Sequence, residues 1–173
     1  MLIYSIYMER KDGHDKEPME FAMPLAVATN FKINGADYLI PMCIEESSVV
    51  AAASNGARLL RAGRGIVSRL ESGKIVAEAF VQTDDISSQI AVASVFAQVD
   101  PYRASTHNKG IMNGIDAMVF AIGGDISEVE AIIHSYASRD GVYRGLSTWT
   151  VQEGRLVGGL NYLFLYSTTV SIQ

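Results

Sequence analysis

The sequence predicts an α+β fold in which central helices pack on antiparallel hairpins within a single domain, residues 1–173. Strand-like apolar runs occur in pairs, and each pair is joined by a dipeptide suited to a tight turn. In the middle of the chain the apolar residues instead recur at helical spacing. The 173 residues, 49% hydrophobic and 19% charged, suffice for one core and are too few to promise two.

The first part of the chain is expected to form strands. Residues 1–8 alternate enough to be a strand, and residues 10–20 are interpreted as a solvated, charged connector. Within 25–44, two apolar runs flank Asn34-Gly35, a dipeptide that readily adopts the positive φ angles of a tight turn. We therefore expect a hairpin there.

A helix and a second hairpin are expected next. Ser47 or Ser48 can cap a helix that runs to Arg61, because apolar residues recur at helical spacing and glycines follow. In 66–81, apolar and polar residues alternate around Ser72-Gly73. This pattern predicts a hairpin that turns at those two residues.

Three further helices are predicted in the middle of the chain, at 87–99, at about 109–122 and at 126–138. Asp125 or Ser127 can cap the last of them. Residues 146–151 and 156–165 are expected to pair as a final hairpin.

This final hairpin is predicted to turn at Glu153-Gly154. Its second strand contains Gly158-Gly159. We interpret that pair as a β-bulge rather than a ligand loop.

Charge and cysteine content exclude several functions. A net charge of −5 and a pI near 5.1 provide no basic face, so no nucleic-acid partner is expected. The single cysteine, Cys43, cannot form an internal disulfide or a cysteine zinc site, which agrees with a reducing compartment. Neither a signal peptide nor a membrane span is recognisable, so we expect a soluble cytoplasmic protein without a membrane partner. No histidine pair or acidic repeat has metal-ligand spacing, so no metal is expected.

The segment 100–116 gathers ionisable, amide and glycine residues inside an otherwise apolar sequence. We expect an irregular backbone after Pro101, with Thr106 or Asn108 capping a helix that starts near Lys109. The Lys109 ammonium would then lie in the first turn, where the helix dipole disfavours a cation. Such a placement points to a chemical role.

Glu46, Lys109 and Asp125 together could form an acid–base–cation set that moves a proton and stabilises an oxyanion. Simpler interpretations remain open, because Glu46 can merely complement a helix dipole and Asp125 can be only an N-cap. Arg103 could bind a carboxylate or phosphate, or form a surface salt bridge.

Histidines offer one candidate for function. His107 lies within the 100–116 segment, whereas His134 follows two isoleucines and is interpreted as a packing residue.

Two long blocks, 24–54 and 100–141, together resemble hydroxymethylglutaryl-coenzyme A reductase of the class II, bacterial and archaeal type. The resemblance implies that Glu46 supplies a proton to the substrate carbonyl, that Lys109 stabilises the oxyanion, and that Asp125 tunes this pair. It also implies substrate-binding roles, which fall on Arg103, Asn113, Ser48 and Thr106.

The family reaction reduces the thioester of hydroxymethylglutaryl-CoA to mevalonate and CoA, or runs in reverse, with NADPH or NADH. The resemblance therefore implies an oxidoreductase of coenzyme A metabolism and isoprenoid biosynthesis. It also implies an acyl-CoA substrate and a homodimer or higher homo-oligomer, because the family's active sites form where subunits meet.

The sequence departs from the family pattern, and two of the departures bear on the reaction. The family places a nicotinamide-binding domain between the counterparts of Glu46 and Asp100, whereas 64–99 leaves room only for a hairpin and one helix. No histidine matches the family histidine that protonates the departing thiolate. Two hypotheses follow: an active reductase, or a catalytically silent family relic that binds acyl-CoA or is only structural.

Overall fold

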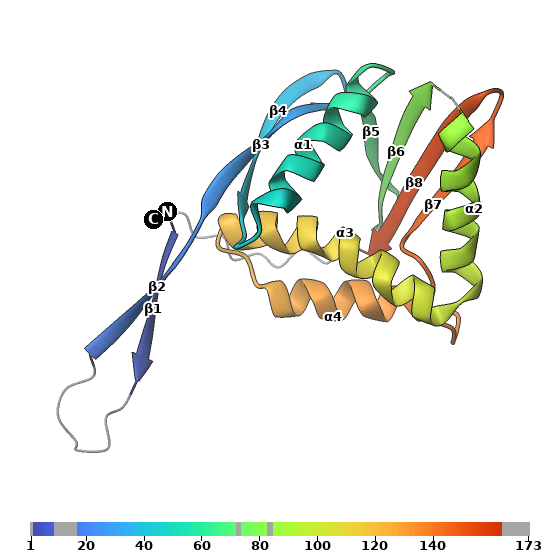
Figure 1. Ribbon diagram of the computed structural model, residues 1–173. Helices are drawn as coiled ribbons and strands as arrows, with labels where there is room; N and C mark the ends of the chain where they lie inside the picture. Colours follow the sequence, from blue (N-terminus) through green and yellow to red (C-terminus); the bar gives the residue numbers. More distant parts are fainter. Residues whose placement is uncertain (1, 9–16, 72–73, 83–84, 164–173) are drawn as a thin grey trace.

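The computed structural model describes residues 2–8, 17–71, 74–82 and 85–163, which form four helices and eight strands (Figure 1). The strands are β1 (Leu2–Met8), β2 (Glu17–Met23), β3 (Leu25–Ile33), β4 (Ala36–Cys43), β5 (Ile66–Glu71), β6 (Lys74–Gln82), β7 (Ser147–Gln152) and β8 (Arg155–Leu163). The helices are α1 (Ser47–Arg61), α2 (Asp85–Val99), α3 (Pro101–Ala121) and α4 (Ile126–Ala137).

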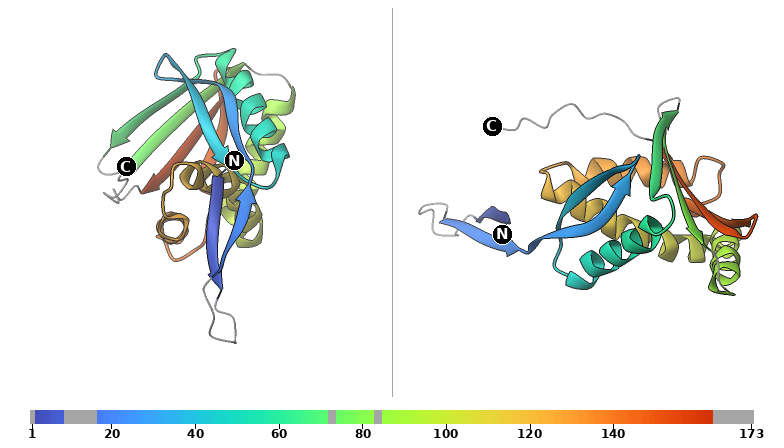
Figure 2. Two further views of the ribbon diagram at one scale, coloured as in Figure 1. Left: turned by 90° about the vertical axis from the view of Figure 1, so that its left-hand side faces the viewer. Right: turned by 90° about the horizontal axis from the view of Figure 1, so that it is seen from above.

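Six of these strands form one mixed sheet in the order β4-β3-β5-β6-β8-β7. All its neighbours run antiparallel except β3 and β5, which meet in parallel at Ile33 and Ile66. β1 and β2 form a separate antiparallel ribbon that projects from the body in all views (Figures 1 and 2). The expected α+β class is confirmed.

Local turn chemistry sets two hairpins as expected. Asn34 and Gly35 have φ angles of 50° and 85°, and Glu153 and Gly154 have 49° and 70°. Positive φ at both central residues matches the right-handed twist of the flanking strands. The β5–β6 hairpin is also confirmed, although its turn, 72–73, lies outside the described residues.

Two sequence-based expectations about strands are corrected. Residues 17–20, assigned to the charged connector, belong to β2, while 10–16 lie outside the described residues. Pro18 is tolerated there because both strands of a two-stranded ribbon are edge strands.

The expected bulge at Gly158-Gly159 is wrong, since β8 pairs with β6 and β7 in unbroken register. A side chain at Gly158 would overlap the Trp149 indole across the strand pair. Glycine therefore makes room for a ring rather than for an extra residue.

The N-terminus of α1 is also different from the expectation. Glu46 occupies the N-cap position with extended backbone, and neither serine caps the helix. The reason is that the Ser48 hydroxyl donates to Glu46 Oε1, so it is engaged with a carboxylate instead of a backbone amide.

The 100–116 segment is helical throughout, and the predicted start near Lys109 is wrong. Asp100 caps α3 by accepting hydrogen bonds from the amides of Tyr102 and Arg103, and Pro101 occupies the first turn. A carboxylate cap followed by a proline is a stronger helix start than Thr106 or Asn108. Lys109 thus lies two turns inside the helix, where the argument from the helix dipole does not apply.

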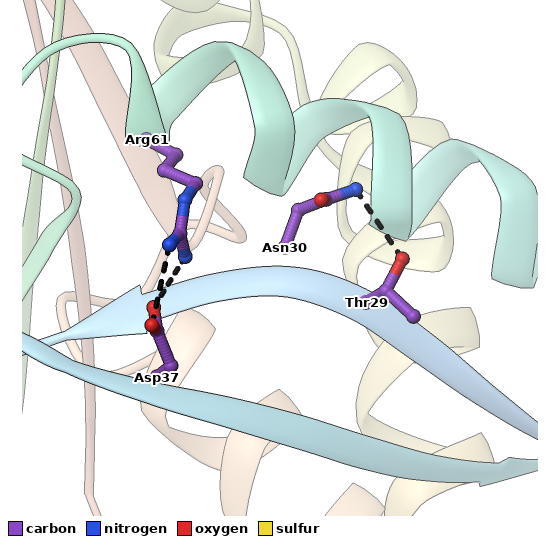
Figure 3. Close-up of polar contacts among 4 residues, drawn as sticks. All are labelled: Thr29, Asn30, Asp37 and Arg61. Carbon is purple, nitrogen blue, oxygen red and sulfur yellow. Dashed lines mark hydrogen bonds and ion pairs between the residues drawn. The ribbon is translucent and has the colours of Figure 1, made fainter.

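Polar contacts join α1 to the β3–β4 hairpin, and Figure 3 shows the one between Arg61 and Asp37. β3 bulges between Ala28 and Phe31, where Asn30 has a φ of 71°, and the Asn30 amide donates to the Ser54 carbonyl at 3.2 Å. At the other end of α1, Arg61 forms a two-pronged ion pair with Asp37.

Helix α3 lies at the centre of the packing. Met112 belongs to a buried cluster completed by Ile133, Ala137 and Leu146, and Ala117 belongs to another formed with Ala28 and Met42. One helix therefore joins the α4 side of the molecule to the β3–β4 side. No helix within the described ranges is long and apolar enough to cross a membrane.

Candidate functional site

Two cavities lie against α3 and share part of their walls. The first, which we name the β4 cavity, has a volume of about 230 Å³, and the second, the α4 cavity, about 370 Å³. The β4 cavity is lined by Met23, Cys43, Ile44, Glu45, Asn113, Asp116, Ala117, Phe120 and Ile126. The α4 cavity is lined by Ser105, Lys109, Met112, Asn113, Asp116, Glu130, His134 and Tyr143. Asn113 and Asp116 are common to both.

Lys109 and Asn113 line the α4 cavity together because they are four residues apart on α3. Lys109 is exposed, and its ammonium makes no hydrogen bond or ion pair with any residue that the structure describes. A free ammonium beside an amide can bind a carboxylate or a carbonyl oxygen.

Asp116 is a residue that the sequence analysis missed. Its Oδ1 is buried and has no hydrogen-bond partner among the described residues. Burial and then the nearby Glu130 charge raise the pKa of the Asp116 carboxyl to about 6, whereas His134 acts in the opposite direction. The only sequence signal was an acid between Ile115 and Ala117, seven residues after Lys109 and hence on the same side of the helix.

The far wall of the α4 cavity is held by an aromatic pair. His134 Nδ1 and the Tyr143 hydroxyl are 2.7 Å apart, and the two rings stack with centroids separated by 5.9 Å. This contact gives His134 a packing role, and the residue also lines the cavity.

Glu46 and Ser48 lie together at the N-terminus of α1, joined by their hydrogen bond. Both are exposed, and the preceding residue, Glu45, lines the β4 cavity. The buried Cys43 thiol lines the same cavity, and burial raises its pKa, which keeps the thiol protonated.

Asp125 is the N-cap of α4, as one of the two open interpretations expects, with Oδ1 accepting the Glu128 amide at 3.1 Å. Ile126, the next residue, lines the β4 cavity. No hydrogen bond within the described chain joins Asp125, Glu46 and Lys109. The three therefore do not form a hydrogen-bonded network among the described residues of one copy of the chain.

Arg103 and Thr106 lie on the first two turns of α3, where the Arg103 guanidinium donates to the Thr106 hydroxyl at 3.0 Å. Arg103 forms no ion pair with a described residue, so the surface salt bridge considered above is absent from that part of the chain.

His107 is half-buried and connects α3 to β7, since its Nε2 is 2.8 Å from the Ser147 hydroxyl. Burial, with Arg103 adding to it, lowers the pKa of His107. A neutral imidazole in a helix–sheet contact is better suited to structure than to proton transfer at neutral pH.

The described residues contain no evident binding site for a metal ion or for a nicotinamide cofactor. No group of three histidine, cysteine or acidic side chains in the described ranges is placed to hold a metal ion. Between α1 and α3 the chain contains β5, β6 and α2. These elements include no glycine-rich turn from a strand into a helix of the kind that binds a dinucleotide pyrophosphate.

The chain is similar in sequence to known proteins of one kind. An Archaeoglobus fulgidus 3-hydroxy-3-methylglutaryl-coenzyme A reductase is 29% identical over 254 aligned residues, which cover 80% of this chain and 58% of that protein. A probable 3-hydroxy-3-methylglutaryl-coenzyme A reductase of Borreliella burgdorferi is 36% identical over 74 residues, 43% of this chain and 17% of its own length. This chain thus spans little more than half of the archaeal relative.

Solved structures share the fold. A Streptococcus pneumoniae 3-hydroxy-3-methylglutaryl-coenzyme A reductase superposes with a TM-score of 0.77 at 24% identity, covering 83% of this chain and 63% of the other. The class II enzyme of that organism bound to NADPH in open conformations gives 0.78 at 23% identity, covering 89% and 73%.

The archaeal alignment is longer than this entire chain, so that relative contains residues without a counterpart here. The hydroxymethylglutaryl-coenzyme A reductase family model itself matches residues 19–87 and 67–162, which include β3, α1 and α3 with the residues that line both cavities. The chain belongs to the hydroxymethylglutaryl-coenzyme A reductase family.

Proposed function

We propose that this chain binds a 3-hydroxy-3-methylglutaryl-CoA-type thioester through its acyl group, at the α3 face that carries Lys109 and Asn113. The observation that carries the proposal is the Lys109 ammonium, which has no partner among the described residues and lies on a cavity that it shares with the Asn113 amide. Lys109 would bind an acyl oxygen through its charge, and Asn113 would fix the orientation of the group. Arg103 and Thr106, one to two turns earlier on α3, would contact the remainder of the ligand.

The described residues offer no evident holder for a nicotinamide. Both cavities are small, at about 230 and 370 Å³, and the described part of the stretch between α1 and α3 includes no dinucleotide-binding turn. We therefore favour acyl-CoA binding without reduction, the silent-relic hypothesis in its binding form, and derive no hydride step.

Reduction to mevalonate and CoA, with NADPH or NADH, is the second candidate. It is favoured by the retention of all three proton-handling positions, with Glu46 as the proton donor, Lys109 as the oxyanion partner and Asp125 as the tuning acid. A site shared between two copies of the chain could bring these groups closer than one copy does.

A homodimer is part of this proposal. Helix α2 and the start of α3 expose apolar side chains in a stripe, with Val92 and Val99 each 70% exposed and Tyr102 88% exposed. Apolar stripes of this kind are typical of protein interfaces. We further propose a cytoplasmic location, in keeping with the single, unpaired Cys43.

Calorimetric titration tests the function directly. We expect the wild type to bind 3-hydroxy-3-methylglutaryl-CoA and not NADPH, and Lys109→Ala to weaken the binding about tenfold or more. Lys32→Ala, which removes a cation on β3 away from both cavities, is the matched control and should bind as the wild type does.

Two other results would change the conclusion. Oxidation of NADPH or NADH in the presence of the thioester, abolished in Lys109→Ala, would establish the reductase instead. If neither ligand binds, the α3 site has only a structural role and the proposal is wrong.

A further inference from the structure

Asp116 has no role in the binding scheme above, although it lies on both cavities. Lys109, Asn113 and Asp116 occupy positions i, i+4 and i+7 of α3, so they form one row about 10 Å long on the helix face. An acyl group that reaches past Lys109 and Asn113 therefore meets the Asp116 carboxyl.

We propose that Asp116 is a ligand-contacting acid that is protonated when an anionic acyl ligand occupies the α4 cavity, so that ligand binding takes up one proton. This inference rests on the proposed function and adds to it a residue and a pH dependence. The step is a simple protonation. A proton from solvent forms an O–H bond on the Asp116 carboxylate, and that O–H then donates a hydrogen bond to a ligand oxygen.

The first argument is hydrogen bonding. Asp116 Oδ1 is buried without a donor among the described residues, which is unfavourable for an ionised carboxylate. Protonation removes the charge and turns the acid into a donor. The acyl group of the proposed ligand offers acceptor oxygens and so supplies the partner that the fold leaves out.

The second argument is the charge around the site. Asp116 shares the walls of the two cavities with Lys109 on its own helix. The other titratable residues on those walls are Glu130 and His134 on α4, Tyr143 after α4, Cys43 at the end of β4 and Glu45 on the loop between β4 and α1. With Asp116 ionised, a ligand carboxylate near Lys109 would also meet the Asp116 and Glu130 carboxylates. With Asp116 protonated, the cavity has one negative charge fewer and one additional donor.

The free protein is already poised for this change, because burial and Glu130 raise the pKa of Asp116 to about 6. A bound anion would raise that pKa further. Binding should therefore weaken as the pH rises above 6, the pH range in which the free protein loses the proton that the complex retains.

The test is titration of 3-hydroxy-3-methylglutaryl-CoA from pH 6 to 8, each pH in two buffers of different ionisation enthalpy. In the wild type the Kd should rise by up to about tenfold per pH unit, with proton uptake on binding. Asp116→Asn keeps the shape and a donor but cannot titrate. It should bind several-fold more tightly than the wild type at pH 8 and take up about one proton fewer at pH 7.

Two further variants make the assignment specific. Asp140→Asn neutralises an exposed acid after α4 and should match the wild type. Glu130→Gln removes the charge that helps to raise the pKa of Asp116, so the weakening should begin at a lower pH. Glu130 is exposed, which makes this variant safe for folding even if Asp116→Asn is not.

The inference is overturned if Asp116→Asn and the wild type show the same pH dependence and proton uptake, because a group other than Asp116 would then carry the titration. That result leaves the proposed function standing. If the wild type binds no thioester at any pH, both the function and this inference are wrong.

Discussion

Asn108 and Asp116 lie two turns apart on α3, and the comparison between them separates structure from chemistry. Asn108 is completely buried, and both polar atoms of its amide are hydrogen-bonded: Nδ2 donates to the Arg144 carbonyl at 2.9 Å, and Oδ1 accepts the Leu146 amide at 2.8 Å. Asp116 is partly exposed, yet its Oδ1 is buried without a partner among the described residues.

The difference shows which polar residue is available to a ligand. Asn108 satisfies the backbone of the segment that leads into β7, so all its hydrogen bonds serve the fold. The Asp116 carboxyl lies on the wall of two cavities, and its Oδ1 has no hydrogen-bond partner among the described residues. A ligand in either cavity can supply that partner. Ranked by burial alone, Asn108 would have been chosen over Asp116 as the residue with a chemical role, which is the wrong order.

The largest expected effect comes from removing the hydrogen bonds of the Asn108 side chain. Asn108→Ala removes the partner of the buried Leu146 amide and of the part-buried Arg144 carbonyl, and it creates a small cavity. We expect a loss of about 2–4 kcal/mol in the free energy of unfolding, measured by urea denaturation. A loss below about 1 kcal/mol would show that water can enter and replace the Asn108 amide as a hydrogen-bond partner.

Packing between β7 and β8 provides the second prediction. Gly158→Ala places a methyl group against the Trp149 indole of β7, and we expect a loss of about 1–3 kcal/mol. Urea denaturation measures this loss. Gly154→Ala is not a suitable control, because Gly154 has a φ of +70° and an alanine there would be strained. Gly159→Ala is the better control, since a methyl group there makes only an ordinary contact. Equal effects at the two positions would argue against the tight indole contact.

At Asp116, by contrast, a substitution is expected to increase the free energy of unfolding. The folded-state pKa of Asp116 is about 6, above the ordinary value of 3.8, so its favourable contribution is fully present below pH 4 and is lost as the pH rises through 6. Asp116→Asn avoids this loss and should be more stable than the wild type by about 1 kcal/mol at pH 8, a value reduced for solvent screening. Near pH 4 the advantage should vanish. Urea denaturation at both pH values measures it, and destabilisation at pH 8 would mean that the carboxylate has a donor.

The smallest effect is expected at the exposed ion pair between Arg61 and Asp37, which serves as a baseline for polar contacts away from α3 (Figure 3). Arg61→Ala should lower Tm by no more than about 1–2 °C, and high salt should remove even that difference. A thermal melt at low and high salt measures this. A much larger change would show that this ion pair, like the Asn108 hydrogen bonds, contributes substantially to stability.

Sequence patterns predicted the elements whose signals are local. The Asn34-Gly35 and Glu153-Gly154 turns follow from backbone preferences of neighbouring residues, and the Asp125 cap follows from its own side chain. The start of α3 was missed because Asp100, nine residues before Lys109, caps the helix first.

The candidate site was less accessible to sequence reasoning. The raised pKa of Asp116 depends on burial and on Glu130, which lies on another helix. Only the folded arrangement of α3 and α4 places those two acids around one cavity. The proton-handling roles of Glu46, Lys109 and Asp125 remain predictions, because one copy of the chain does not join them by hydrogen bonds.

The most direct test of the contrast is a ¹³C NMR titration of the Asp116 carboxyl in the folded, ligand-free protein, assigned by its loss in Asp116→Asn. The midpoint should lie near pH 6. A midpoint at or below the ordinary 3.8 would show that a donor already satisfies the carboxylate, and the distinction from Asn108 would fail.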